Sequence, residues 1–228
     1  MPIVAEHVIP RIFLPQLASL RETIFTRVLT AFDGLEAEAD EIQRGTLERL
    51  EATANEYSDG ADIAEAAFDA GLEHYALITG ARQTVINALA VALSHLFEQQ
   101  RHLLTLRTLV DSEPNSRQRE KNFSEFLATH GIDRTMVIHQ AKLEELDLVA
   151  NVAKHAEGQS AERLRTLRPE LLVPPSIRGD STLASPVGPI NRTLMGEDLY
   201  VQPDHLRDYF DAVESFWKCV LGRLSRTP

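Results

Sequence analysis

The sequence predicts an all-α fold: a helical bundle with a long N-terminal helical hairpin and a Pro/Gly-rich loop before the C-terminal helix. Apolar residues recur at helical spacing through most of the 228 residues. The regular alternation of strands and helices that typifies a parallel sheet does not occur. With 43% hydrophobic and 25% charged residues, the composition is that of a globular protein. We therefore expect one all-helical domain spanning residues 1–228.

The first predicted element is a long helix or arm over residues 16–57, in which Leu17, Leu20 and Ile24 begin the helical spacing. Gly34 is the position at which this helix is expected to break or bend. The second half is rich in Asp and Glu. We expect it to project as one arm of a hairpin or to pack along a narrow seam only.

A helical core is predicted over residues 60–168, with an interruption of its first helix near Thr79–Gly80. The second half of that helix is apolar on nearly every face, which is typical of a central core helix. Further helices are expected from Arg119 to Thr129, from Asp133 to about Ala156, and over a brief segment that Ser160 caps.

An irregular loop is predicted over residues 169–199, because five prolines and three glycines fall within it. Loops of this length are usually functional or mobile, and the role of this one stays open. A final amphipathic helix is expected over residues 203–226, with Asp204 as its N-terminal cap.

Composition favours a cytoplasmic protein. Cys219 is the only cysteine, so an intramolecular disulfide is excluded, which fits a reducing compartment. The N-terminus lacks a basic segment followed by an apolar run, so we expect no signal peptide. The best apolar run, Val85–Leu93, is shorter than the roughly 18 residues that a membrane span requires, so no membrane association is expected.

The net charge of −11 restricts the partners of the chain. Proteins that bind nucleic acid usually carry a basic face, because neutralising phosphates supplies much of their affinity. Binding of RNA would therefore need a local basic patch on an acidic body. Arg163 and Arg165 lie in a cluster of arginines that could form such a patch.

The segment that we expect to carry function is a polar stripe formed by Asp147, Asn151, Lys154 and His155. Helical geometry places these four residues, with Glu144 between them, in a sector about 100° wide. We take the rest of the helix to be apolar, so the stripe should border a groove or another subunit. The alternative is a plain solvent face, with His155 favoured by the helix dipole near the C-terminus.

The residue types of the stripe suit phosphate chemistry. Asn151 and His155, one turn apart, can hydrogen-bond the same phosphate or water. Lys154, Arg163 and Arg165 could supply positive charge, and Asp147 could orient the imidazole. We therefore consider His155, Asn151, Lys154 and Asp147 as catalytic candidates, and Arg163, Arg165, Glu98 and His95 as binding candidates.

The order of these parts resembles HEPN domains. The apolar helix carries a polar break at residues 93–100, and a later helix contains Asn151 and ends at His155. In that family the motif is an Arg, commonly followed by Asn, Asp or His, with a His four to six residues beyond the Arg. The resemblance covers about residues 80–160. It implies a helical bundle that dimerises to form a composite, metal-independent ribonuclease site, often in toxins or defence proteins.

One position departs from the family motif. Asn151 and His155 occupy its second and last positions, but Ala150 stands where the Arg should be. That Arg carries positive charge to the scissile phosphate. Lys154 or Arg163 could replace it, or the site is inactive. A literal match to the Arg-to-His spacing, Arg134 to His139, ranks second because Arg134 lies in the first turn of its predicted helix.

No metal or other cofactor is expected. The helices lack the facing Glu-x-x-His pairs of a di-metal bundle, and the chain lacks a Gly-rich phosphate loop. His95 and Glu98 are better explained as a buried or interfacial hydrogen-bonded pair. Glu98, in so apolar a helix, needs a partner, and Arg82, Arg101 or His155 could be that partner.

Two functions follow, and whether the protein is an enzyme stays open. The first is an RNA-directed homodimer of the HEPN kind in a bacterial defence or toxin–antitoxin system, either a ribonuclease or a catalytically degenerate relative. The second is a non-catalytic helical interaction or regulatory subunit. It would hold a protein partner with the polar stripe and the Pro-rich loop.

Overall fold

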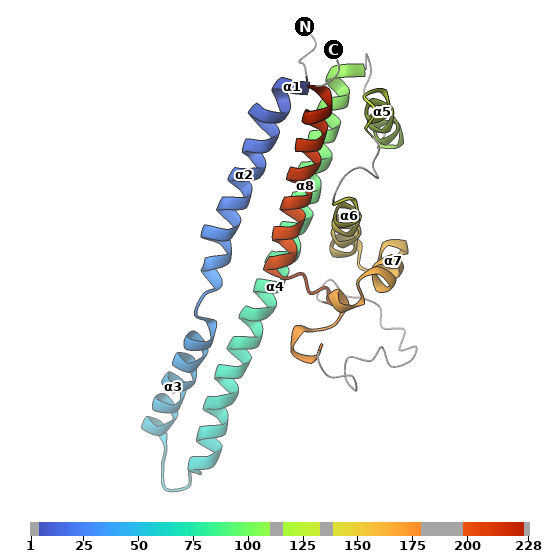
Figure 1. Cartoon of the computed structure of the whole chain (residues 1–228). Coiled ribbons are helices and arrows are strands. Elements are labelled where there is room, and N and C mark those ends of the chain that lie inside the picture. Colours follow the sequence, from blue (N-terminus) through green and yellow to red (C-terminus); the bar gives the residue numbers. More distant parts are fainter. Residues whose placement is uncertain (1–4, 110–115, 133–138, 179–197, 226–228) are drawn as a thin grey trace. The chain divides into compact units, whose positions relative to one another are not determined.

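The computed structural model of the chain describes residues 5–109, 116–132, 139–178 and 198–225 (Figure 1). Every regular element within these ranges is helical, and no strand occurs among them. The predicted all-α fold is confirmed. The helices are α1 (Ala5–Val8), α2 (Leu14–Thr23), α3 (Leu35–Thr53), α4 (Gly60–Leu109), α5 (Ser116–Thr129), α6 (Gln140–His155), α7 (Gln159–Leu167) and α8 (Pro203–Leu224).

Short helical turns of other pitch join these helices. Residues Ile9–Phe13 and Ile24–Val28 form π-helical turns, whereas Leu29–Phe32, Pro169–Leu172 and Pro175–Ile177 form 3₁₀ turns. The loop predicted over 169–199 thus begins with two 3₁₀ turns, and residues 179–197 lie outside the described part of the chain. The predicted helix start at Asp133 also lies outside it.

The chain divides into two compact units, one formed by Ile24–Val85 and the other by Met1–Thr23 with Ile86–Pro228. The sequence had placed an arm at 16–57 and a core at 60–168. The structure instead assigns residues 60–85 of α4 to the unit that holds α3. We call residues 24–85 the arm.

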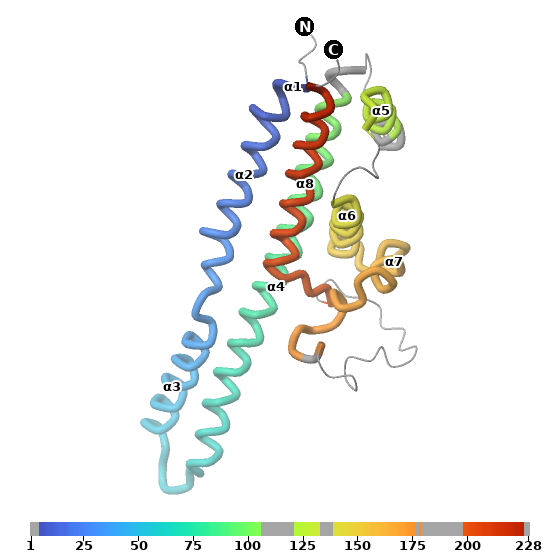
Figure 2. The backbone as a smooth tube through the Cα atoms, viewed as in Figure 1, coloured from blue at the N-terminus to red at the C-terminus, as the bar shows by residue number. Residues whose placement is uncertain are grey.

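The arm is a hairpin of α3 and the first part of α4, which run side by side in the tube of Figure 2. Gly34 adopts a left-handed conformation (φ 82°) just before α3, so the predicted break at this residue is confirmed. Small buried residues form the seam. A Cβ placed on Gly71 would lie 3.0 Å from both the Ala39 carbonyl oxygen and the Gln43 Cβ, so the two helices approach closely there.

The interruption predicted near Thr79–Gly80 is wrong, because α4 continues through both residues. A single glycine costs a helix only about 1 kcal/mol relative to alanine, which neighbouring turns outweigh. The sequence predicts no membrane span, but α4 is long and apolar enough to be a candidate. An 18-residue window within Gly60–Thr105 has a mean hydropathy of 1.4, and 22% of that window is buried. One such helix is weak evidence for a membrane span, since core helices of soluble proteins pass the same test.

The unit formed by residues 1–23 and 86–228 has a core centred on α8. The helix that the sequence predicted there is confirmed. Trp217 packs against Phe13 and Phe97, with ring centroids 4.7 and 5.7 Å away. Its indole N–H donates to Gln100 Oε1 at 2.6 Å, while Gln100 Nε2 donates to the Phe13 carbonyl at 3.3 Å. These bonds satisfy a buried amide and tie α8, α4 and the first π-helical turn together.

The cap of α8 differs from the predicted one. Gln202 is the N-cap, and the Nδ1 of His205 accepts a hydrogen bond from the Gln202 backbone N–H at 3.0 Å. Asp204 lies within the first turn instead, where a carboxylate still interacts favourably with the helix dipole. The α7 helix likewise begins after Gly158 (φ 141°), so Ser160 is not its cap.

Candidate functional site

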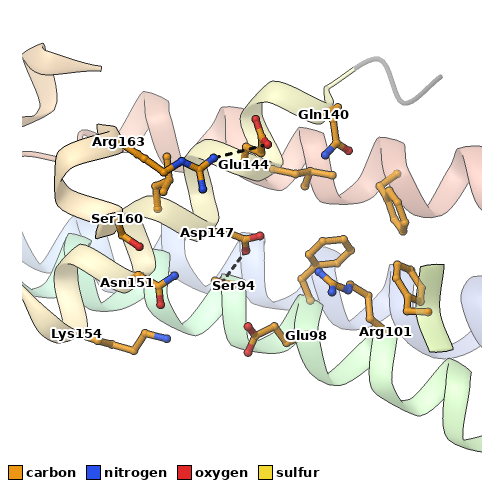
Figure 3. Close-up of a pocket in the computed structure, with 15 residues that line it drawn as sticks. Ser94, Glu98, Arg101, Gln140, Glu144, Asp147, Asn151, Lys154, Ser160 and Arg163 are labelled. Atoms are coloured by element: carbon orange, nitrogen blue, oxygen red, sulfur yellow. Dashed lines mark hydrogen bonds and ion pairs between the residues drawn. The ribbon is translucent and has the colours of Figure 1, made fainter. Parts of the chain in front are cut away.

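Three residues of the predicted stripe lie on the wall of one pocket (Figure 3). The pocket has a volume of about 340 Å³ and lies among α4, α6 and α7, with α5 and α8 contributing aromatic side chains. Its lining consists of Ser94, Phe97, Glu98, Arg101, Phe123, Gln140, Leu143, Glu144, Asp147, Leu148, Asn151, Lys154, Ser160, Arg163 and Phe216.

The helical repeat of α6 orients these side chains. Asp147, Asn151 and Lys154 follow one another at spacings of four and three residues, so they share a face. The opposite face is anchored in the core by buried Leu146 and Val149. Of the four stripe residues predicted to border a groove, these three line the pocket.

Charges of both signs line the pocket in equal number: the carboxylates Glu98, Glu144 and Asp147, and the cations Arg101, Lys154 and Arg163. Figure 3 shows Lys154 from α6 and Glu98 from α4 extending into the same space. Ser94 Oγ lies 3.5 Å from Asp147 Oδ1, and Arg163 Nη2 lies 3.9 Å from Glu144 Oε1. The pocket suits a charged group better than an apolar one.

One of the lining cations, Arg101, lies over two aromatic rings. The Arg101 guanidinium carbon lies 4.9 Å from the ring centre of Phe123 and 5.4 Å from that of Phe97. Cation–π contacts of this kind hold a guanidinium in place. Arg101 is thus a fixed positive charge contributed by α4.

His155 does not line this pocket. It is exposed at the last residue of α6, beside Ala156, whose φ of 56° ends the helix. Asp147 lies eight residues earlier, which is about 12 Å along a helix axis, so it cannot orient the imidazole as expected. Ala150, at the family's Arg position, is 1% exposed and faces the core.

The His95–Glu98 pair is exposed, whereas the sequence predicted a buried or interfacial one. His95 Nδ1 lies 3.9 Å from Glu98 Oε2, and their side chains are 65% and 59% exposed. Glu98 therefore needs no compensating partner, because water solvates its carboxylate. Glu98 lines the pocket and His95 does not.

Arg163 and Arg165, the arginines of the predicted basic patch, lie two residues apart on α7 and therefore point to different sides of that helix. Arg163 and Arg165 are both exposed there, and Arg165 is paired with Glu157 at 2.6 Å. In the second match to the family spacing, His139 is the N-cap residue of α6, and Arg134 lies outside the described residues.

Sequence reasoning missed a buried carboxylate on the opposite face of α6. Glu145 is 3% exposed, accepts a hydrogen bond from the Tyr209 hydroxyl at 2.8 Å, and is ion-paired with Arg168 and with Lys142, whose Nζ lies 3.3 Å away. The prediction that this face is apolar is therefore wrong at Glu145. A Glu among leucines was the available signal, because a buried carboxylate requires partners.

The surroundings of Glu145 shift several pKa values. Burial and the nearby carboxylate raise the pKa of Tyr209. Burial acts to raise the pKa of Glu170, but the hydrogen bond and charge of Arg168 outweigh it and lower that pKa. Burial, helped by the positive charge of Arg168, lowers the pKa of His205. Because Glu145 is enclosed and fully paired, we assign this cluster a structural role.

No family model, curated protein or solved structure matches this chain. Among the described residues, no three His, Cys, Asp or Glu side chains come together in a way that could hold a metal ion. The pocket and the groups at its rim are therefore the features from which we infer a function.

Proposed function

We propose that the protein is RNA-directed and HEPN-like, and that the C-terminal end of α6 contacts the RNA. The observation that carries this proposal is the convergence of Asn151 and Lys154 on one pocket, with Arg163 beside them. Lys154, Arg163 and the neighbouring His155 are exposed, so a phosphate at the pocket mouth could reach them. An RNA substrate also favours a cytoplasmic location.

The proposed chemistry needs no metal. The ribose 2′-oxygen attacks the adjacent phosphorus, the bond from phosphorus to the 5′-oxygen breaks, and a 2′,3′-cyclic phosphate forms. A neutral His155 would take the 2′-hydroxyl proton, while Lys154 and Arg163 would offset the charge that builds on the phosphate. The 5′-oxygen needs a proton, and His155 of a second copy in a homodimer would donate it.

A second function is favoured by two observations. Ala150 is buried where the family motif has its Arg, and three carboxylates line the pocket that a phosphate would approach. Both features favour a non-catalytic interaction subunit. In that case the charge-balanced pocket would receive a charged segment of a protein partner.

Incubation of the purified protein with total RNA in excess EDTA tests the proposed ribonuclease activity. Under the first function the purified chain cleaves RNA, and His155→Ala lowers the rate by at least about 100-fold, the usual effect of losing a general base. His7→Ala is the matched control, because His7 is also exposed and lies in α1. Absence of cleavage, at concentrations where light scattering reports a dimer, rejects the enzymatic function.

Binding of a fluorescent single-stranded RNA then separates the remaining alternatives. An RNA-directed but inactive protein binds the oligomer, and Lys154→Glu weakens this binding while Lys218→Glu, on exposed α8 surface, leaves it unchanged. If the wild-type chain does not bind RNA, the RNA-directed proposal fails and the interaction subunit stands.

A further inference from the structure

The arm presents an apolar strip to solvent, formed by Phe68 and Leu72 on α4. Both side chains are 54% exposed, and adjoining exposed apolar side chains can mark an interaction surface. They are four residues apart and therefore lie one above the other on the same helical face. The seam with α3 is formed instead by Ala39, Ala67 and Gly71, so α3 does not cover the strip.

The arm is also where the negative charge of the chain is concentrated. Residues 24–85 hold thirteen carboxylates and four arginines, a net charge of −9 within the −11 of the whole chain. Three of these carboxylates adjoin the strip: Glu65, Asp69 and Glu73 follow one another at four-residue spacing, and all three are exposed. The apolar strip therefore has an acidic border.

We propose that this strip is the docking surface for a basic amphipathic helix of a partner protein. An apolar stripe on such a helix would cover Phe68 and Leu72, and Lys or Arg residues beside that stripe would face Glu65, Asp69 and Glu73. Helices that recognise a partner in this way present apolar anchors at spacings of three and four residues. The proposal is independent of any activity at the α6 pocket.

The negative charge of the arm favours a basic helix over a second copy of this chain and over an anionic bilayer. A second copy would bring its own net charge of −9 against the arm, and like charges facing each other disfavour association. A bilayer surface rich in anionic lipid would be repelled in the same way. A cationic helix gains from the same charges, and attraction between opposite charges also accelerates its encounter with the arm.

The probe is a fluorescein-labelled synthetic helix with leucines at i and i+4 and lysines on both sides of them, added to the full chain. Fluorescence anisotropy should report binding that weakens at least tenfold between 0.05 and 0.5 M NaCl, because salt screens the ionic contacts. A peptide with glutamate in place of lysine should bind at least tenfold more weakly.

Substitutions in the strip test whether the peptide binds there. Phe68→Ser with Leu72→Ser should weaken binding at least tenfold. Leu77→Ser is the matched control, since Leu77 is 72% exposed and lies about half a turn around α4 from Phe68. Circular dichroism checks that each variant keeps its helical content. Binding that the double variant leaves unchanged overturns the proposal.

Two further outcomes would also overturn it. If light scattering shows a dimer that the double variant alone converts to monomer, the occupant is a second copy. If neutral phosphatidylcholine vesicles sediment the wild type but not the double variant, the occupant is a bilayer. Salt-sensitive binding of the basic peptide without either outcome supports the proposal.

Discussion

Replacing Glu145 with alanine should destabilise the unit that contains α6 and α8 by about 3 kcal/mol, near the lower end of the range for breaking a buried ion pair. The three partners of Glu145 lose different amounts. Arg168 and Lys142 are partly exposed and keep second carboxylates, Glu170 and Asp208. Neither becomes an isolated buried charge.

The Tyr209 hydroxyl accounts for much of the expected loss. Tyr209 is fully buried, and without Glu145 its hydroxyl loses an acceptor 2.8 Å away. An unsatisfied buried hydroxyl costs about 1–3 kcal/mol, and the emptied side-chain volume adds to that cost. In a Tyr209→Phe background this penalty is absent, so Glu145→Ala should cost about 1–2 kcal/mol less there.

Urea unfolding followed by Trp217 fluorescence is the assay, because Trp217 is the only tryptophan and is buried in this unit. Glu144→Ala is the control: Glu144 adjoins Glu145 in sequence but is exposed and paired with Arg163 at 3.9 Å, so its loss should cost under about 1 kcal/mol. Equal effects of the two substitutions would refute the assigned role of Glu145.

Three further predictions concern pH and packing. The pKa of His205 is lowered because the folded state favours the neutral ring. The free energy of unfolding should therefore fall as pH drops from 6.5 through that lowered pKa, and an NMR titration of the imidazole measures the pKa itself. The raised pKa of Tyr209 contributes stability that is complete below pH 10 and lost as pH rises further, and urea unfolding of Tyr209→Phe should show a smaller loss over that range. Gly71→Leu should separate α3 from α4 and speed hydrogen exchange across 35–85, because even a Cβ there lies 3.0 Å from Ala39 and Gln43. Gly45→Ala, with nothing within 4 Å, should instead stabilise α3 by about 1 kcal/mol in thermal melts, and equal behaviour of the two variants would contradict the seam.

Apolar periodicity was enough to predict the helices, because each buries a face that repeats along its own sequence. It could not predict that residues 60–85 would join α3, since the choice of neighbour depends on contacts distant in sequence. Gly71 illustrates this limit: in sequence it is a weak helix position, and only the structure shows Ala39 against it.

The candidate site was predicted in part for a similar reason. Asp147, Asn151 and Lys154 lie within about 60° of one another around α6 and face the pocket together, whereas His155 lies at the edge of the stripe and falls outside. Glu145 could not be recognised from sequence because two of its partners are distant in the chain: Arg168 is the C-cap of α7, and Tyr209 lies in α8. Only Lys142 is close enough in sequence to suggest an ion pair.

The seam of the arm limits which substitutions the arm can tolerate. Gly71 can be exchanged for little else, because Ala39 and Gln43 of the neighbouring helix occupy the space that a side chain would need, and Ala39 and Ala67 are buried in the same seam. Phe68 and Leu72 face no such restriction, because both are exposed and polar residues would fit at either position. Sequence drift at these two positions, compared with the seam beside them, therefore records whether the arm has been kept under selection for a partner.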